Sequence, residues 1–202
     1  MTTAQRWRLP ALIIRAPFAV AAVSGVPVGA KRVVKQFECR GKRLATEYRG
    51  AVAIFASRNR QADDETVIED VFRHNGHKAG AAGEASRFCA ACDVWRYRLV
   101  GFVKLFDVAT AEQVASATVK DQRAIHALAF DFAAAWQVET YLCLEPLHAL
   151  AVPGVLFNEA CAGCLALPPH NISACHVGWQ TVELSCVPPV VAAEIRPWPL
   201  RK

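Results

Sequence analysis

Two short apolar runs enclose a strongly basic segment in the first quarter of the chain, and they limit the folds that are open to it. The runs are 11–14 and 50–57, and each has the length of a strand that is buried on both faces. Pro17 follows the first run where its missing N–H costs nothing, at the start of a helix that Ser24-Gly25 would end. Strand, helix and strand in such close succession predict a fold of class α+β.

The rest of the chain continues this mixture of short strands and helices. The expected elements are a polar arm over 1–10, a turn over 26–29, a helix over 59–76, a flexible loop over 79–88, a strand over 95–108, one or two helices over 110–136 and a strand over 137–144 with a turn-rich continuation to 154. Gly101, inside the expected strand over 95–108, marks a bulge or a close approach of another backbone. Short strands interleaved with helices favour a small mixed β-barrel with flanking helices over a doubly wound sheet.

Positive charge is concentrated in the segment 31–49. The chain of 202 residues has a formal net charge of +5, and this segment alone reaches the same sum. Its basic residues, set against only Glu38 and Glu47, are Lys31, Arg32, Lys35, Arg40, Lys42, Arg43 and Arg49. A positive patch on a near-neutral body favours a polyanionic ligand, with phosphate as the first candidate. The alternative is a solvated loop with surplus lysine and arginine.

Composition indicates a folded chain that has its own core and does not enter the membrane. Hydrophobic residues make up 53% and charged residues 20% of the sequence, which is enough apolar material for a core. No apolar stretch reaches the length of a spanning helix. Arg15 and Pro17 interrupt an N-terminal run that resembles a signal peptide, and eight cysteines without a small-scaffold spacing suit reduced thiols. We therefore expect a cytoplasmic protein.

The motif Lys35-x-x-Glu38-x-Arg40 lies inside the basic segment. Alternation along a strand would place Lys35 on the face opposite Glu38 and Arg40, so a bulge or bend near Gln36 is needed to gather them. Arg40 could bind phosphate or Glu38, and Glu38 could accept from the amino group of a nucleobase or hold Lys35 in place. Lys35 could bind phosphate or, when buried, act as a base, and Arg15 could line the same cleft. The simpler alternative is a Glu38–Arg40 ion pair that only fixes the loop.

Three blocks of the sequence resemble the ASCH domains of the PUA-like superfamily. The blocks are Ile14-Arg15-Ala16-Pro17-Phe18 leading to Ser24-Gly25, Lys35-x-x-Glu38-x-Arg40 followed by the strand after Tyr48, and 100–105 together with 141–154. Residues 26–34 are an insertion relative to the family, which usually has a glycine two positions before the motif lysine. The resemblance implies a small PUA-like mixed β-barrel over 1–157, with 158–202 as a Pro/Cys-rich extension packing on it.

The same resemblance implies a ligand class and a site. It suggests RNA, a nucleotide or a modified nucleoside in a cleft beside the motif. The implied ligand-binding residues are Arg15, Lys35, Glu38, Arg40, Tyr48, Arg49 and Ser57. Phe18, Phe37 and Tyr48 could stack on a base, although each suits a core as well.

An enzymatic alternative follows from other members of the superfamily. Some are amidohydrolases that act on N4-acetylcytidine, and others resemble ribonucleases. Lys35 and Glu38 would be the catalytic pair in either chemistry. Glu38 stands where the amidohydrolases have a threonine, so a binding module is the first hypothesis and a hydrolase the second.

The cysteines suggest a third hypothesis, a zinc-stabilised interaction protein. The residues with zinc-knuckle spacing, and those that follow them, are Cys89, Cys92, Cys161, Cys164, His170, Cys175 and His176. The two Cys-x-x-Cys pairs are farther apart than in usual zinc ribbons, and small buried hydrophobes are the simpler interpretation. Beyond such structural zinc, no cofactor is expected.

Cys39 could be a reactive thiolate beside Lys35 and Arg40, but a strand cysteine that faces the core fits the pattern better.

Overall fold

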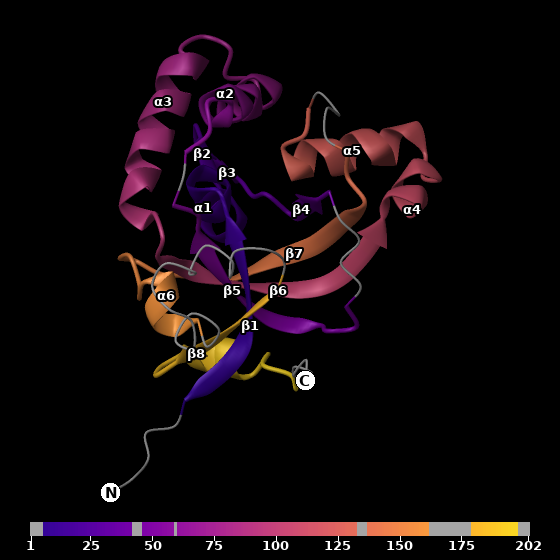
Figure 1. Cartoon of the computed structure of the whole chain (residues 1–202). Helices are drawn as coiled ribbons and strands as arrows, with labels where there is room; N and C mark the ends of the chain where they lie inside the picture. Colours follow the sequence, from indigo (N-terminus) through magenta and orange to yellow (C-terminus); the bar gives the residue numbers. More distant parts are fainter. Residues whose placement is uncertain (1–5, 42–45, 59, 133–136, 162–178, 198–202) are drawn as a thin grey trace, which may run out of the picture.

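The computed structural model describes residues 6–41, 46–58, 60–132, 137–161 and 179–197 (Figure 1). Its elements are β1 (Trp7–Ile14), α1 (Ala16–Ser24), β2 (Val26–Val28), β3 (Lys31–Val33), β4 (Phe37–Arg40), β5 (Gly50–Ala56), α2 (Asp64–His74), α3 (Ala81–Ala91), η1 (Cys92–Trp95), β6 (Leu99–Thr110), α4 (Ala111–Ala115), α5 (Val119–Ala129), β7 (Thr140–Ala149), α6 (Phe157–Ala160), β8 (Gln180–Leu184) and α8 (Pro189–Ala192). They confirm the expected α+β class. No helix in these ranges is both long and apolar enough to cross a membrane.

Six strands form one sheet in the order β4-β7-β6-β5-β1-β8, and this sheet curls into a half-barrel (Figure 1). β1 and β5 run parallel, whereas the other neighbouring strands are antiparallel. β6 lies in the interior of the sheet, as its dense apolar sequence predicts. The register shifts between β5 and β6 and again between β6 and β7, and such bulges bend the strands locally.

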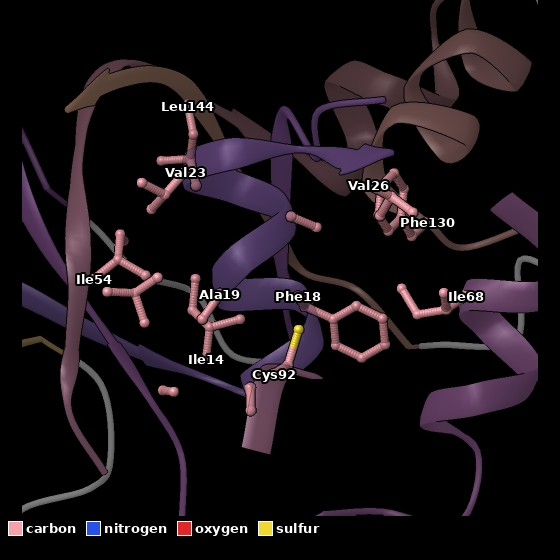
Figure 2. Close-up of a cluster of buried hydrophobic side chains, with 14 of the residues drawn as sticks. Ile14, Phe18, Ala19, Val23, Val26, Ile54, Ile68, Cys92, Phe130 and Leu144 are labelled. Atoms are coloured by element: carbon pink, nitrogen blue, oxygen red, sulfur yellow. The ribbon is translucent and has the colours of Figure 1, made fainter. Parts of the chain in front are cut away.

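Apolar side chains pack on both faces of the sheet, and β1 and β5 are consequently buried on both sides. Alternate residues of β5, such as Ile54 and Phe55, belong to separate clusters on opposite faces. The helix α1 packs against β5, β6 and β7 with Phe18, Ala19 and Val23 on its buried side (Figure 2). This cluster also receives Ile68 from α2.

Gly101 marks a close backbone approach, as expected from its place in a strand. A Cβ atom at this position would lie 2.6 Å from Cγ1 of Val23 and 2.4 Å from the main-chain oxygen of His148. A side chain there would therefore push α1 or β7 away from β6.

The expectation of a flexible loop over 79–88 is wrong, because most of these residues form α3. Ala81, Ala85 and Cys89 recur at every fourth residue and are buried, so they make one face of a packed helix. The Ala/Gly composition suggests flexibility, but the high helix propensity of alanine and the packing against α2 decide the structure.

Three other expectations need correction in the same direction, toward more regular structure. The turn over 26–29 is part of a hairpin in which β2 pairs with β3 around Gly29. The polar arm over 1–10 is too long, since β1 begins at Trp7. The strand β7 continues to Ala149 and passes through Pro146, which lies at a register shift where proline is tolerated in a sheet.

Part of the C-terminal segment 158–202 joins the main sheet. β8 pairs antiparallel with the first half of β1, from Trp7 opposite Leu184 to Ala11 opposite Gln180. The cluster on this face combines Phe55 with Val182 and Val191. The described residues of this segment thus contribute an edge strand to the sheet.

Candidate functional site

The half-barrel is open along a seam, which we define as the space between β4 and residues 12–14 of β1. β8 pairs with β1 only from Trp7 to Ala11, so it does not cover the end of β1. Arg40 of β4 reaches across the seam, and its Nη2 donates to the main-chain oxygen of Ile13 at 3.2 Å. A side chain, rather than a ladder of backbone hydrogen bonds, therefore joins the two strands here.

A cavity of about 470 Å³ lies at this seam, a size within the range of small-molecule sites, roughly 300–1,000 Å³. It is lined by Ile13, Ile14, Arg15, Phe18, Lys35, Glu38, Cys39, Arg40, Gly41, Ser57, Gln61, Val67, Ala129, Phe130 and Asp131. Five of the residues predicted to bind ligand are among them, namely Arg15, Lys35, Glu38, Arg40 and Ser57. The structure thus brings the core of the predicted site together in one cavity.

Lys35 reaches the cavity because the chain leaves the strand conformation between β3 and β4. Its main-chain N–H donates to the oxygen of Ala21 at the end of α1, at 3.1 Å. The N–H of Gln36 donates to Leu128 in α5 (2.9 Å), and the oxygen of Gln36 accepts from Leu144 in β7 (2.7 Å). This bend at Gln36, which the motif required, places Lys35 on the same side as Glu38 and Arg40.

Lys35, Glu38 and Arg40 form a compact charged group. Nζ of Lys35 donates to Oε2 of Glu38 at 2.8 Å and also to the main-chain oxygen of Phe37. Nη2 of Arg40 lies 3.3 Å from the other carboxylate oxygen, Oε1. Lys35 and Glu38 are 5% and 8% exposed, so this is a buried pair rather than a surface contact. The contacts orient all three side chains at the cavity wall.

Glu38 remains ionised in this setting. Burial alone would raise the pKa of its carboxyl, but the charges of Lys35 and Arg40 and the hydrogen bond from Lys35 outweigh that effect. The pKa of Glu38 is consequently lowered from its ordinary value.

Arg40 keeps a donor to which the described residues offer no acceptor. Its Nη2 contacts Glu38 and Ile13, while its Nε is buried and has no hydrogen-bond partner among the residues that the structure describes. A buried N–H without an acceptor costs about 1–3 kcal/mol, so a binding partner with an oxygen acceptor would recover this cost.

Arg15 borders the cavity from the start of α1. Its Nη1 lies 2.8 Å from Gln61, 2.7 Å from Asp63 and 2.8 Å from Asp64, and its guanidinium lies 4.5 Å from the centre of the Phe18 ring. Asp64 is fully buried, and this burial raises the pKa of its carboxyl despite the hydrogen bond from Gln61 and the charge of Arg15. Arg15 therefore joins α1 to the start of α2 as well as lining the cavity.

Tyr48 and Arg49 do not line the cavity. The hydroxyl of Tyr48 donates to the main-chain oxygen of Ala51 at 2.7 Å, and burial raises its pKa. Arg49 pairs with Asp107 of β6 at 3.2 Å. The resemblance to ASCH domains implied that both residues contact the ligand, but the chain has moved to another part of the sheet by Gly50.

The rest of the basic segment is divided between several places. Lys31 and Arg32 lie on the β2–β3 hairpin, where Arg32 donates to the main-chain oxygen of Ser24 at 3.1 Å. Lys42 and Arg43 fall outside the described residues. Only part of the positive charge that the sequence concentrates is therefore gathered at the cavity.

Among the cavity residues that sequence reasoning missed are Phe130 and Asp131, which follow α5. Phe130 ends this helix with a left-handed φ of 62°, and the N–H of Asp131 donates to the oxygen of His126 at 2.9 Å. Asp131 is 5% exposed, and its Oδ2 lies 3.4 Å from Nδ1 of His126. No local pattern marks these residues, because the contact of α5 with β4 brings them to the seam.

Cys39 is a poor nucleophile in this structure. Burial raises the pKa of its thiol to about 12, and the nearby charges of Lys35 and Arg40 offset only part of that effect. Its partly buried position on β4 agrees with a packed strand cysteine.

The zinc hypothesis concerns residues that are only partly described. Cys89, Cys92 and Cys161 are buried free thiols, and burial raises the pKa of Cys89 and Cys92 to about 12. Within the described ranges, no group of three or more His, Cys, Asp or Glu side chains could hold a metal ion. The other candidate ligands, Cys164, His170, Cys175 and His176, lie outside these ranges.

The cavity combines three kinds of recognition. Arg15, Lys35 and Arg40 supply cationic donors, and Glu38 and Asp131 supply carboxylate acceptors. The formal charges of these five lining side chains sum to +1, and the charge of Arg15 is partly offset by Asp63 and Asp64 next to the cavity. Apolar surface comes from Ile13, Ile14, Phe18, Val67 and Phe130. This arrangement can hold a small molecule with an anionic group, a hydrogen-bonding edge and a flat apolar body.

Comparison with known proteins does not extend this description. No protein-family model matches the chain, and a search of curated proteins gives no match.

Proposed function

We propose that the cavity at the seam binds a nucleotide, either free or as an unpaired nucleotide of RNA, and that the protein acts as a binding module. The observation that carries the proposal is the convergence of Arg15, Lys35 and Arg40 on one cavity, with the buried Nε of Arg40 lacking an acceptor among the described residues. Phosphate oxygens are strong acceptors for guanidinium and ammonium groups.

The remaining walls support the same ligand class. Phe18 and Phe130 offer aromatic surface against which a base could lie, and the carboxylates of Glu38 and Asp131 offer acceptors for base N–H groups. The size of the cavity suits one nucleotide unit rather than a duplex. The resemblance of the Lys35-x-x-Glu38-x-Arg40 region to ASCH domains suggests the same ligand class.

Binding of nucleoside monophosphates and of a labelled single-stranded RNA, measured by calorimetry and fluorescence anisotropy, tests the proposal. Arg40→Gln should weaken binding by at least about ten-fold, since it removes a charge-assisted contact. Arg49→Gln makes the same charge change in the same basic segment but outside the cavity, and should have little effect. Equal weakening by the two variants, or no binding of either probe, would refute the proposal.

Salt dependence separates the free nucleotide from the RNA. RNA held at the cavity through one phosphate predicts a slope of about −0.7 in log K against log salt, and RNA that also follows the basic hairpin predicts a steeper slope. A free nucleotide has no condensed counterions to release and should show a shallower dependence. A single-site slope for the RNA would assign recognition to the cavity alone.

A hydrolase is the second candidate, because a buried lysine–carboxylate pair borders the cavity. Nζ of Lys35 donates to Glu38 and to the oxygen of Phe37, which leaves a third N–H for a ligand. The pair could assist attack of water on the amide of an acylated nucleoside, with the acyl group leaving as a carboxylate and the amine protonated. Turnover of acetylated nucleosides that disappears in a folded Lys35→Met variant would support this activity, and binding without turnover would exclude it.

A further inference from the structure

We propose that Asp131 makes the cavity selective for nucleobases that present an exocyclic amino group, against bases that present a carbonyl oxygen or a hydrogen at the same position. This inference rests on the proposed nucleotide-binding function and adds a specificity-determining residue to it. Cytosine, adenine and guanine are the amino-bearing bases, whereas uracil and hypoxanthine are their counterparts without the amino group.

The backbone of Asp131 is held firmly with respect to the seam. Its N–H donates to His126 at 2.9 Å, and the N–H of Phe130 donates to Ala127 at 3.2 Å, so the end of α5 closes tightly. The N–H of Gln36 donates to Leu128 at 2.9 Å and joins this helix end to the bend that carries Lys35. These hydrogen bonds hold the backbone of Asp131 in a fixed position relative to the backbone of Lys35.

Asp131 supplies a second carboxylate to the cavity wall, beside that of Glu38. Lys35 and Arg40 engage the two oxygens of Glu38 at 2.8 and 3.3 Å, respectively. Oδ2 of Asp131 lies 3.4 Å from Nδ1 of His126. A carboxylate has about four lone-pair sites and can accept from a ligand while it keeps its protein contacts.

The position of Asp131 in the cavity suits a base edge rather than a phosphate. It is 5% exposed and lies at the wall next to Phe130, an aromatic ring that could contact the face of a base. An anionic acceptor there repels phosphate, which the cations Arg15, Lys35 and Arg40 attract. A bound nucleotide would therefore place its phosphate toward the cations and its base toward Asp131.

An ionised carboxylate only accepts hydrogen bonds, and this property distinguishes the two groups of bases. An amino group donates to it, whereas a carbonyl oxygen opposite it brings two acceptors together in a poorly solvated site. Sites that hydrogen-bond a particular ligand group discriminate strongly against analogues that lack it.

Matched pairs of nucleotides test this inference in the full chain. Calorimetry should be performed with CMP against UMP, and with AMP and GMP against IMP. The amino-bearing member of at least one pair should bind roughly ten-fold or more tightly. In Asp131→Asn the side-chain amide can rotate to donate or accept, so the preference should fall to about threefold or less, with UMP or IMP binding better than before.

Two controls keep the outcomes distinct. Asp107→Asn changes an exposed carboxylate that pairs with Arg49 away from the cavity, and it should retain the preference. Asp131→Ala should lose affinity for the amino-bearing nucleotide and keep its affinity for the other, which also reports an intact cavity. Equal binding of both members by the unmodified protein, or an unchanged preference in Asp131→Asn, would overturn this inference and leave the proposed function standing. Failure of the unmodified protein to bind any of the nucleotides would refute both.

Discussion

Nη2 of Arg40 lies 3.2 Å from the main-chain oxygen of Ile13 and joins β4, at one end of the sheet, to β1. The same guanidinium contacts Glu38 and lines the cavity. One side chain thus contributes both to the closure of the seam and to the charge of the site. Changes at Arg40 should for this reason affect stability and binding together.

Arg40→Gln should destabilise the protein by about 1–3 kcal/mol, because it removes the guanidinium that contacts the carbonyl of Ile13 and Oε1 of Glu38, while Lys35 still donates to Oε2. Urea unfolding followed by circular dichroism measures this free energy. Arg73→Gln is the control, since Arg73 forms an exposed pair with Glu69 within α2 that is worth about 0.5 kcal/mol or less. Equal unfolding free energies for the two variants would show that the contact across the seam contributes nothing.

Glu38→Gln should lower stability most at neutral pH and much less in acid. The folded-state pKa of Glu38 lies below its unfolded value of about 4.5, so its ionised form stabilises the fold above that pH. This contribution is lost as the pH falls through the folded-state pKa. Removal of one partner of a buried ion pair costs about 3–5 kcal/mol at pH 7.

Urea unfolding of both proteins between pH 7 and pH 3 provides the measurement for Glu38. The difference in unfolding free energy between the unmodified protein and the variant should shrink below about pH 4.5. A difference that stays constant over the whole range would mean that Glu38 is not ionised in the fold.

Cys39 should react slowly with iodoacetamide despite its place at the cavity. Burial raises its pKa to about 12, so very little thiolate is present at pH 8. Cys186 is exposed and should be modified at least about a hundred-fold faster. Peptide mass spectrometry of timed samples distinguishes the two sites, and comparable rates would contradict the described burial of Cys39.

Features of the fold that depend on neighbouring residues could be predicted from the sequence. Pro17 lies in the first turn of α1, and the bend at Gln36 follows from the need to place Lys35 beside Glu38. The loop expected over 79–88 was wrong because composition alone does not show that Ala81 and Ala85 have a helix to pack against. The sequence therefore predicted local structure correctly only where the residues within a segment determine that structure without a distant packing partner.

The candidate site was predictable only where the motif itself forms it. Lys35, Glu38 and Arg40 are close in sequence and remain close in the fold. Asp131 comes to the cavity through the hydrogen bond between Gln36 and Leu128, which no spacing in the sequence reveals. Arg49 leaves the site because β5 starts immediately after it and runs to a different part of the sheet.

The pairing of β8 with β1 has a consequence for synthesis of the protein. While the chain grows on the ribosome, the outer edge of Trp7–Ala11 has no strand beside it until Leu184 has been added and released from the exit tunnel. An uncovered edge of this kind can pair with another nascent chain. Termination just before Gln180 would remove the last 23 residues of the sequence, β8 among them, while every described residue that lines the cavity would still be present. Such a truncation should therefore lower solubility through the uncovered edge of β1 even though the cavity residues are retained.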